Sequence, residues 1–240
     1  MKLEGKVAVI TGASRGIGLA IAEAFEREGA KLILTAKKNL DSLGRFKNAK
    51  TIPLDLSSNQ SISLFLEEAV KVFGKIDILV NNAGIFKQTD FEAISAQELD
   101  DFLDVDFKGP FLLTQKIFIQ MKKQKYGKII NIASGAGKMG SSKAIHYACA
   151  KAALISLTKS LARIGGQYNI SVNAVAPGYI ETDMIKDILL EKKAMIEGSI
   201  PLGRIGQDRN VAGPVLFFAS ADSDYITGQT LCVDGGHCMI

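Results

Sequence analysis

Short apolar runs alternate with longer amphipathic segments along this chain, and no other feature of the sequence restricts the fold as much. Such runs are typical of parallel strands that helices cover on both faces. The expected strands are 7–11, 31–35, 77–81, 128–133, 170–177 and a late one within 231–236, and the amphipathic segments are 16–28, 58–73, 96–120 and 147–163. We therefore predict an α/β fold built on a doubly wound parallel sheet with right-handed crossovers.

The chain contains no internal repeat, no low-complexity tract and no linker rich in Pro, Gly or Ser. With 240 residues and 47% hydrophobic residues it can bury a sizeable core, so we expect one domain over residues 1–240. The stretch between Pro177 and Pro201 carries helix-forming residues where a strand is expected. A helical substrate loop at about 178–206 explains this break, and a plain packing helix explains it nearly as well.

Charge and cysteine content exclude several classes of protein. The net charge of +4 is spread along the chain, and its densest basic run, 121–128, is most simply a solvated helix end. Binding of this run to an acidic carrier protein or a coenzyme is the minority interpretation, and binding to nucleic acid is weaker still. Three cysteines without a CxxC pair indicate neither a disulfide framework nor a metal site. There is no signal-peptide pattern and no apolar run near the ~18 residues of a membrane span. We expect a cytoplasmic protein with no membrane partner.

A glycine-rich turn, TGASRGIG at 11–18, follows the first expected strand and opens the first helix. Gly12, Gly16 and Gly18 form a GxxxGxG variant of the dinucleotide fingerprint. Glycines let backbone N–H groups and a helix N-terminus approach a pyrophosphate closely. A P-loop nucleotidase is excluded because no Gly-Lys-Ser/Thr follows the loop. The context predicts a dinucleotide-binding Rossmann sheet.

The end of the second strand indicates which dinucleotide is bound. It reads TAKK at 35–38, without the carboxylate that usually accepts the ribose 2′-hydroxyl of NAD. Lys37 and Lys38 stand there instead, and Arg15 adds a cation from the glycine loop. Basic side chains suit a 2′-phosphate, so we predict NADP(H), with ordinary surface charges as the alternative.

Further motifs follow in a fixed order: NNAG at 81–84, Ser134 in NIAS, YACAK from Tyr147 to Lys151, and PGYIETDM at 177–184. With TGASRGIG they resemble the short-chain dehydrogenase/reductase family, from the first strand to the final VDGG. Within it the chain is most similar in look to the 3-oxoacyl-(acyl carrier protein) reductases of fatty acid biosynthesis. The resemblance implies an NADP-dependent oxidoreductase acting on CH-OH or C=O groups and a homotetramer. A dehydrogenase of a small secondary alcohol, sugar or polyol stays open as an alternative.

The motif IHYACAK places Tyr147 and Lys151 four positions apart, on one face of a helix. By resemblance, Tyr147 donates its phenolic proton to the substrate carbonyl, and Ser134 holds the carbonyl oxygen. A free tyrosine has a pKa near ~10, and the cation of Lys151 lowers it. Lys151 also binds the nicotinamide ribose in the family.

The resemblance also assigns residues to the cofactor. Asp55, which follows a third strand, matches the acid that contacts the adenine amine, although it could instead cap the next helix. For Asn81 and Asn82 of the NNAG motif, the alternative to a family role is capping of a loop. Thr182 and the backbone of Ile180 meet the carboxamide. The implied cofactor-binding set is Gly12, Ser14, Arg15, Gly16, Ile17, Gly18, Lys37, Asp55, Leu56, Asn82, Ala83, Gly84, Tyr147, Lys151, Pro177, Gly178, Ile180 and Thr182.

One position departs from the family. Its members usually carry an asparagine in a VN-x-x-G-x-F pattern that completes a catalytic tetrad, whereas this chain reads VDFKGPF at 105–111, with Asp106. An ionised carboxylate only accepts hydrogen bonds, and it competes for the ammonium of Lys151. Asp106 could do the work of the asparagine as a catalytic residue, it could reduce activity and shift the pH optimum, or the chain could be a weakly catalytic NADP(H)-binding protein.

Some residues near these motifs invite other roles. His146 points about 100° away from Tyr147 along the helix, so we expect a substrate-pocket or surface histidine rather than a catalytic one. Cys149 is expected to be a buried small hydrophobe, and His237 could line a subunit contact. The basic cluster Lys122, Lys123, Lys125 and Lys128 could meet an acidic acyl carrier protein, although Tyr168 and Asn169 stand where such reductases often have a second arginine.

Overall fold

Seven parallel strands form one sheet in the computed structural model of this chain, which describes residues 1–239. Their order across the sheet is β3-β2-β1-β4-β5-β6-β9, so the chain winds outward in both directions from its first strand. The predicted doubly wound sheet is confirmed. The strands are β1 (Val7–Thr11), β2 (Lys31–Ala36), β3 (Ala49–Pro53), β4 (Ile78–Asn81), β5 (Gly127–Ile132), β6 (Ile170–Pro177) and β9 (Thr230–Val233).

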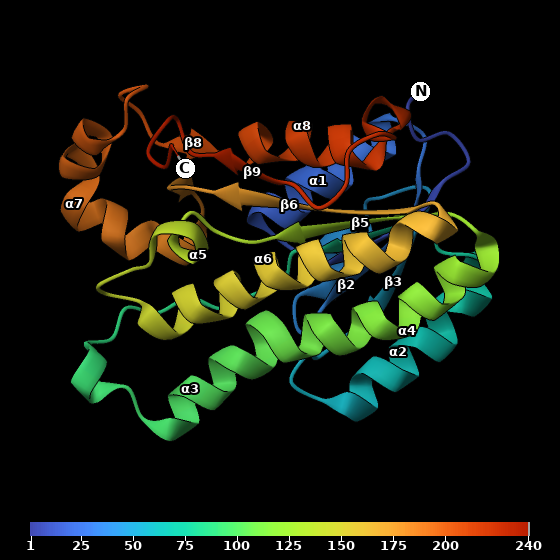
Figure 1. Ribbon diagram of the computed structural model, residues 1–240, viewed down its shortest axis with the longest axis horizontal. Helices are drawn as coiled ribbons and strands as arrows, with labels where there is room; N and C mark the ends of the chain where they lie inside the picture. Colours follow the sequence, from blue (N-terminus) through green and yellow to red (C-terminus); the bar gives the residue numbers. More distant parts are fainter. Residues whose placement is uncertain (240) are drawn as a thin grey trace.

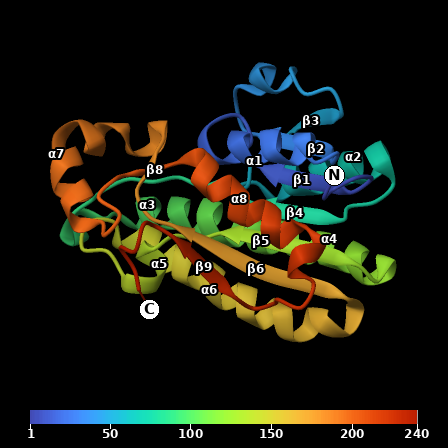
Figure 2. The ribbon, with the colours of Figure 1, turned by 90° about the horizontal axis from the view of Figure 1, so that it is seen from above.

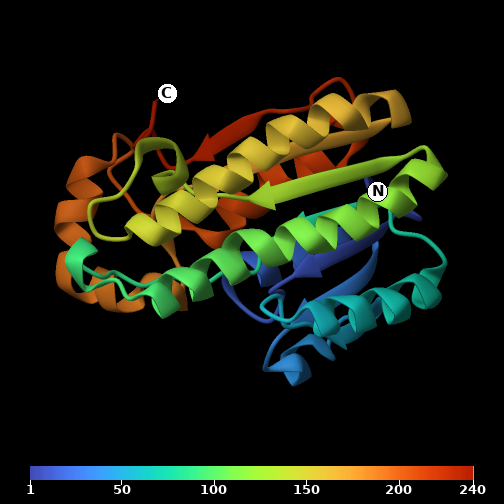
Figure 3. The ribbon, with the colours of Figure 1, turned by 60° about the horizontal axis from the view of Figure 1, so that its bottom comes forward.

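Helices cover both faces of the sheet because the side chains of each strand alternate between them. In β1, Ile10 packs in one buried cluster with Phe25 of α1, while Val9 packs in another with Phe65 of α2. Figure 1 shows the two helix layers with the sheet between them, and Figure 3 shows α2, α4 and α6 crossing one face. One layer holds α1 (Gly16–Arg27) and α8 (Asp208–Ala219); the other holds α2 (Asn59–Phe73), α4 (Gly109–Gln124) and α6 (Ile145–Gly165).

The edge strand β3 has the weakest sequence signal of the sheet. It reads AKTIP, and only Ile52 of its five residues is buried. An edge strand has one neighbour and is partly open to water, so it does not need the continuous apolar run of a central strand. By contrast, all five residues of β1 are buried.

The amphipathic segment 96–120 is not one uniform helix. It consists of α3 (Ala96–Leu103), a π-helical turn η3 (Asp104–Lys108) and then α4. A π-turn accommodates an extra residue within a helix and often marks a functional site. Here the wide turn contains Asp106, the only one of its five residues that is buried.

The chain after β6 forms an insertion whose two ends are joined by a pair of short strands. β7 (Ile180–Glu181) pairs in parallel with β8 (Gly206–Gln207), and between them lie η5 (Asp183–Ile185) and α7 (Lys186–Ser199). Figures 1 and 2 show α7 and the chain's carboxyl end beside the carboxyl ends of the strands. The other short elements are η1 (Leu40–Leu43), η2 (Phe91–Ala93), α5 (Ala136–Met139), η4 (Gly166–Tyr168) and η6 (Ala221–Ser223).

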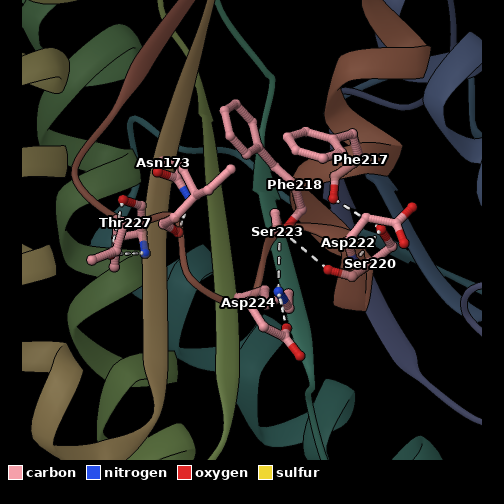
Figure 4. Close-up of polar contacts among 11 residues, drawn as sticks. Asn173, Phe217, Phe218, Ser220, Asp222, Ser223, Asp224 and Thr227 are labelled. Carbon is pink, nitrogen blue, oxygen red and sulfur yellow. Dashed lines mark hydrogen bonds and ion pairs between the residues drawn. The ribbon is translucent and has the colours of Figure 1, made fainter.

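The basic run 121–128 lies at the end of α4, where the chain turns into the amino end of β5. Lys123 and Lys125 are exposed, as expected of a solvated helix end, but Lys128 is only 3% exposed. Its Nζ lies 2.8 Å from Asp224 Oδ1 and donates to Ser223 Oγ at 3.3 Å, a contact whose two acceptors are labelled in Figure 4. Lys128 therefore joins the sheet to the loop before β9, and its expected place in a carrier-binding cluster is wrong.

The same loop is tied to β6 by a second set of polar contacts. Asn173 Nδ2 donates to the Ile226 carbonyl at 2.8 Å, and the Val172 N–H donates to Thr227 Oγ1 at 3.0 Å. Figure 4 shows Asn173 and Thr227 side by side at this point. None of the helices within residues 1–239 is long and apolar enough to cross a membrane.

Candidate active site

A cleft of about 960 Å³ opens at the carboxyl ends of the strands. Ligands in open α/β sheets bind at this edge, outside the strand ends. Every predicted cofactor-binding and catalytic residue lines the cleft except Asp106, which lies behind it. The cleft is also lined by residues that were not predicted to bind the cofactor or to act in catalysis, among them Thr35, Phe86, Tyr179, Asp183, Asp234 and His237.

The glycine loop is shaped by close backbone contacts. Gly12 has φ +65 and Gly16 has φ +53, a region that favours glycine. A Cβ on Gly18 would lie 2.3 Å from the Gly12 carbonyl oxygen and 2.4 Å from Asn82 Nδ2, so no larger residue fits there. Helix α1 begins at Gly16 with no side-chain cap and no acidic residue in its first turn. Its N–H groups and positive dipole end are therefore available to an anion.

The residues of this edge fit a dinucleotide. The loop leaves space where glycines replace side chains, the helix N-terminus supplies unpaired donors, and the cleft has the size of a cofactor site. The buried hydroxyl of Thr35 lines the same cleft and has no hydrogen-bond partner within the described residues. A buried polar atom of this kind usually has a partner, which a bound ligand can provide.

The two asparagines of NNAG join elements rather than cap a loop. Asn82 Nδ2 donates to the Thr11 carbonyl at 2.8 Å and to the Gly12 carbonyl at 3.1 Å, which holds the glycine loop in place. Asn81 Nδ2 donates to Thr114 Oγ1 and to Asn131 Oδ1, both at 2.8 Å, and so links β4 to α4 and β5. The loop-capping alternative is wrong for both.

Two ion pairs flank the end of the cleft that the second strand borders. Lys37 Nζ lies 2.7 Å from Asp55 Oδ2, and Arg15 Nη1 lies 3.3 Å from Asp183 Oδ2 on the insertion. Partial burial opposes the ionisation of Asp55, but hydrogen bonds from Lys37 and Ser57 outweigh it and hold the pKa of its carboxyl below the usual value.

The alternative role of Asp55 as a helix cap is excluded by the geometry of α2. Ser58 is the N-cap residue of that helix, and its side chain accepts a hydrogen bond from the Ser61 N–H at 3.2 Å. Asp55 instead accepts hydrogen bonds from the Ser57 N–H at 3.0 Å and the Ser57 hydroxyl at 2.7 Å. Its remaining oxygen faces Lys37.

Ser134, Tyr147 and Lys151 meet in the cleft from two elements. Ser134 follows β5, and its hydroxyl is hydrogen-bonded to Tyr147 in the first turn of α6. Lys151 lies one turn further along α6, with Nζ 5.5 Å from the centre of the Tyr147 ring and 3.3 Å from the Ile132 carbonyl oxygen. Phe86 packs edge-on against the Tyr147 ring at 5.0 Å. The predicted shared helix face of Tyr147 and Lys151 is confirmed.

Asp106 lies directly behind Lys151 and is completely buried. Its Oδ1 is 3.3 Å from Lys151 Nζ and accepts a hydrogen bond from the Ile85 N–H at 3.2 Å, while Oδ2 has no partner within residues 1–239. A Cβ on Gly84 would lie 2.4 Å from Oδ1. The glycine of NNAG therefore leaves the space that this carboxyl occupies.

The three titratable groups influence one another. Burial raises the pKa of Tyr147; the charge of Lys151 opposes this and that of Asp106 adds to it, so the pKa stays above its ordinary value. Burial lowers the pKa of Lys151, but Asp106 and Tyr147 outweigh it and the pKa is raised. Burial raises the pKa of Asp106, and Lys151 offsets only part of that. Tyr147 is thus protonated and Lys151 charged at neutral pH.

Two neighbouring residues lie elsewhere than expected. His146 is neither in the cleft nor on the surface: it is 1% exposed, packs against Phe102 with ring centres 3.9 Å apart, and has Nε2 3.2 Å from Glu98 Oε1. Cys149 is exposed rather than buried. Helix periodicity predicted that both side chains point away from Tyr147. It could not predict that α3 covers His146 and leaves Cys149 exposed.

Comparison with known proteins places the chain among oxidoreductases. A family profile described as enoyl-(acyl carrier protein) reductase matches residues 12–237. A 3-oxoacyl-(acyl carrier protein) reductase of Vibrio cholerae is 42% identical over 246 residues, covering 100% of each chain. A solved short-chain type dehydrogenase/reductase from Mycobacterium marinum aligns with a TM-score of 0.94 at 34% identity, over 100% of this chain and 98% of that one. A structure named as a candidate gluconate dehydrogenase from Agrobacterium tumefaciens gives 0.96 at 28% identity, with the same coverage.

Proposed function

The chain belongs to the short-chain dehydrogenase/reductase family, and on this premise we propose that it is an NADPH-dependent reductase of 3-oxoacyl-(acyl carrier protein) thioesters. The product is the 3-hydroxyacyl thioester. The observation that carries the proposal is the meeting of Ser134, Tyr147 and charged Lys151 at the wall of a dinucleotide-sized cleft. The full-length identity of 42% to a protein named for this reaction supports the choice of substrate.

The chain's residues would hold NADPH, which supplies the hydride when it is bound. The glycine loop and the first turn of α1 would bind the pyrophosphate. Lys37 and Arg15 would bind the 2′-phosphate, since each can exchange its carboxylate partner for the more highly charged anion. Asp55 would face the adenine, while Thr182 and the Ile180 backbone would meet the carboxamide. Each of these residues lines the cleft.

Tyr147 acts as the general acid. The carbonyl oxygen of the substrate gains negative charge as its carbon is reduced, and the Tyr147 hydroxyl donates a proton to that oxygen. Ser134 is hydrogen-bonded to the same hydroxyl and shares the task of holding the oxygen. The ammonium of Lys151 stabilises the phenolate that remains. Because its pKa is raised, the Tyr147 hydroxyl is protonated before the reaction and has a proton to donate to the carbonyl oxygen.

Asp106 is proposed to work through Lys151. Its ion pair helps to keep the buried amine protonated, so Lys151 can stabilise the phenolate despite burial. The same negative charge raises the pKa of Tyr147, so the phenol stays protonated to higher pH but is a weaker acid. Of the interpretations left open by the sequence, this favours an active reductase whose pH profile differs from that of an enzyme with asparagine at this position.

The remaining parts of the proposal concern the insertion and the assembly. Residues 178–206 would form the substrate loop, because Tyr179, Met184 and Ile188 face the cleft from it. We further propose a cytoplasmic homotetramer. The acyl carrier protein would approach from the carboxyl edge of the sheet, where the cleft opens. Lys123 and Lys125 are at the end of α4, next to the amino end of β5, and so lie away from that edge.

A panel of carbonyl substrates tests the proposal. Purified protein is mixed with NADPH and, separately, with 3-oxoacyl thioesters, enoyl thioesters, ketoses and small diketones, and the loss of NADPH absorbance is followed. Turnover of the 3-oxoacyl thioester supports the proposal. Turnover of ketoses alone would favour a sugar or polyol dehydrogenase, which the likeness to the candidate gluconate dehydrogenase keeps in view. NADPH binding without turnover of any substrate would identify a weakly catalytic binding protein.

A further inference from the structure

Two of the three cysteines meet beside the cleft without belonging to it. Cys232 stands in β9 and Cys238 follows it in the carboxyl-terminal segment. Their Sγ atoms and a carboxylate oxygen of Asp234 all lie within 4.8 Å of one another, and the two thiols are hydrogen-bonded to each other. The third cysteine, Cys149, is exposed on α6 and takes no part in this cluster.

The two thiols have different surroundings. Cys232 is partly exposed, and Lys138 Nζ donates to its Sγ at 3.4 Å. A dissolved oxidant reaches a partly exposed thiol before a buried one. Cys238 is 5% exposed, and burial, followed by the nearby Cys232, raises the pKa of its thiol. Cys232 is therefore the thiol that an oxidant in solution attacks first, with Cys238 in place to react next.

We propose that Cys232 and Cys238 form a reversible dithiol–disulfide site that peroxides oxidise. The Cys232 thiolate attacks one peroxide oxygen, the O–O bond breaks, and a sulfenic acid and one water form after proton uptake. The Cys238 sulfur then attacks the Cys232 sulfur, the S–O bond breaks, and the hydroxyl leaves as a second water with the thiol proton. Two thiols are oxidised to one disulfide, and one peroxide is reduced to two waters. A dithiol reductant reverses the reaction by exchange.

The loop between the two cysteines supports both the cleft and the insertion. Asp234 and His237 line the cleft. The Gly178 N–H donates to the Val233 carbonyl at 3.1 Å, and a Cβ on Gly178 would lie 2.5 Å from Asp234 Cβ. At the other end of the insertion, the Leu202 N–H donates to the Gly235 carbonyl at 3.1 Å. A change in this loop therefore reaches both ends of residues 178–206.

Disulfide formation changes the loop because it shortens the contact between the sulfurs to about 2.05 Å and imposes a specific dihedral angle. The backbone of Cys238 is tied to Asp234, whose Oδ2 accepts its N–H at 2.8 Å. Pulling Cys238 towards Cys232 thus moves Asp234 and the backbone that packs against Gly178. We expect the oxidised protein to bind its ligands in the cleft less well than the reduced protein.

The same cluster is a poorer metal site. Both oxygens of Asp234 already accept backbone N–H groups, from Gly236 at 3.0 Å and from Cys238 at 2.8 Å. The Lys138 ammonium stands against Cys232 Sγ, where a metal cation would have to displace it. The contacts hold the loop in shape and leave the two sulfurs as the reactive pair.

The test uses the full-length Cys149→Ser protein, so that the exposed thiol cannot react. It is treated with hydrogen peroxide, and the intact mass and a non-reducing peptide map are recorded. We expect the loss of two hydrogen atoms, a Cys232–Cys238 cross-linked peptide, and reversal by dithiothreitol. NADPH affinity, followed by cofactor fluorescence, should weaken or kcat/KM should fall, by about 10-fold or more given how sensitive sites are to ~1 Å displacements. Cys232→Ser and Cys238→Ser in the same background serve as matched controls. Neither should form the cross-link; the Cys232→Ser protein should keep its mass, whereas the Cys238→Ser protein should gain oxygen on Cys232.

Three results would contradict the proposed dithiol–disulfide site. The first is oxidation of Cys232 to a sulfinic acid without a cross-link, and the second is a disulfide between two chains. The third is zinc that copurifies with the protein and protects both thiols from oxidation. If the cross-link forms but NADPH affinity and kcat/KM stay unchanged, the disulfide has no effect on binding in the cleft. The mass and fluorescence readouts need no carbonyl substrate, so they report on the dithiol even if the proposed reductase activity is absent.

Discussion

Asp106 Oδ1 lies 3.3 Å from Lys151 Nζ, in an ion pair whose two side chains are 0% and 4% exposed. Burying two charges is costly, and a pair of this kind is retained only where its geometry or function compensates. Here the ammonium of Lys151 also faces Tyr147. The carboxylate therefore determines how much of the Lys151 charge is available to the phenol, and the predictions below begin with this pair.

We expect Asp106→Asn to retain or increase reductase activity and to move the pH profile to lower pH. The Asp106 charge raises the pKa of Tyr147, so its removal lowers that pKa. Reduction needs the protonated phenol, and its rate falls as pH rises through the pKa of Tyr147. The decline should therefore begin at lower pH in the variant than in the wild type. Rates of 3-oxoacyl thioester reduction measured across pH check this.

Asp104→Asn is the matched control, because Asp104 belongs to the same π-turn but pairs at the surface with Lys108. That substitution should leave the pH profile unchanged. An Asp106→Asn protein that binds NADPH normally yet has no activity would show that this assignment of the position is wrong.

Tyr147→Phe should lower kcat by about 10²- to 10⁴-fold, the usual contribution of a positioned general acid. The substitution removes one hydroxyl and keeps the ring that packs against Phe86, so NADPH affinity and thermal stability should change little. Steady-state kinetics and fluorescence titration measure the two effects. Tyr225→Phe, at a fully exposed tyrosine, is the control. Equal losses in both variants would disprove the role of Tyr147.

Lys37→Ala should lower kcat/KM for NADPH by about 10- to 100-fold, which corresponds to one charge-assisted hydrogen bond of ~1.5–3 kcal/mol. The same ratio for NADH should change little, because NADH lacks the 2′-phosphate. Lys50→Ala removes another exposed lysine, on β3, and should leave both ratios unchanged. If the values for the two cofactors fell in parallel, Lys37 would not be a 2′-phosphate ligand.

Gly18→Ala should abolish dinucleotide binding, since the new methyl would meet the Gly12 carbonyl and the Asn82 amide. Gly213→Ala is an informative contrast: this glycine lies in α8, and a Cβ there meets nothing within 4 Å. We expect that second substitution to stabilise the protein by about 0.5–1 kcal/mol. Calorimetry and NADPH titration on both proteins check the pair. Normal cofactor binding by Gly18→Ala would refute the proposed pyrophosphate loop.

Local patterns were sufficient for the architecture and for part of the site. The run at 170–177 coincides with β6, and the run at 7–11 coincides with β1, because a strand buried on both faces must be apolar along its length. The four-residue spacing of Tyr147 and Lys151 likewise predicted their shared helix face, since that geometry depends only on the helix itself. The edge strand β3 gave a weaker signal because water covers part of it.

The remaining features required the packing of distant elements. The sequence identified Asp106 as unusual, but only the π-turn between α3 and α4 brings its carboxyl behind Lys151, in the space left by Gly84. In the same way, only the loop after β9 brings Cys238 back to Cys232. The periodicity of a helix or strand shows which face a side chain occupies, but the residue that it meets there depends on how the elements pack. The sequence by itself therefore determined the sheet, the dinucleotide loop and the acid with its cation, and the tertiary structure decided which charge and which thiol stand beside them.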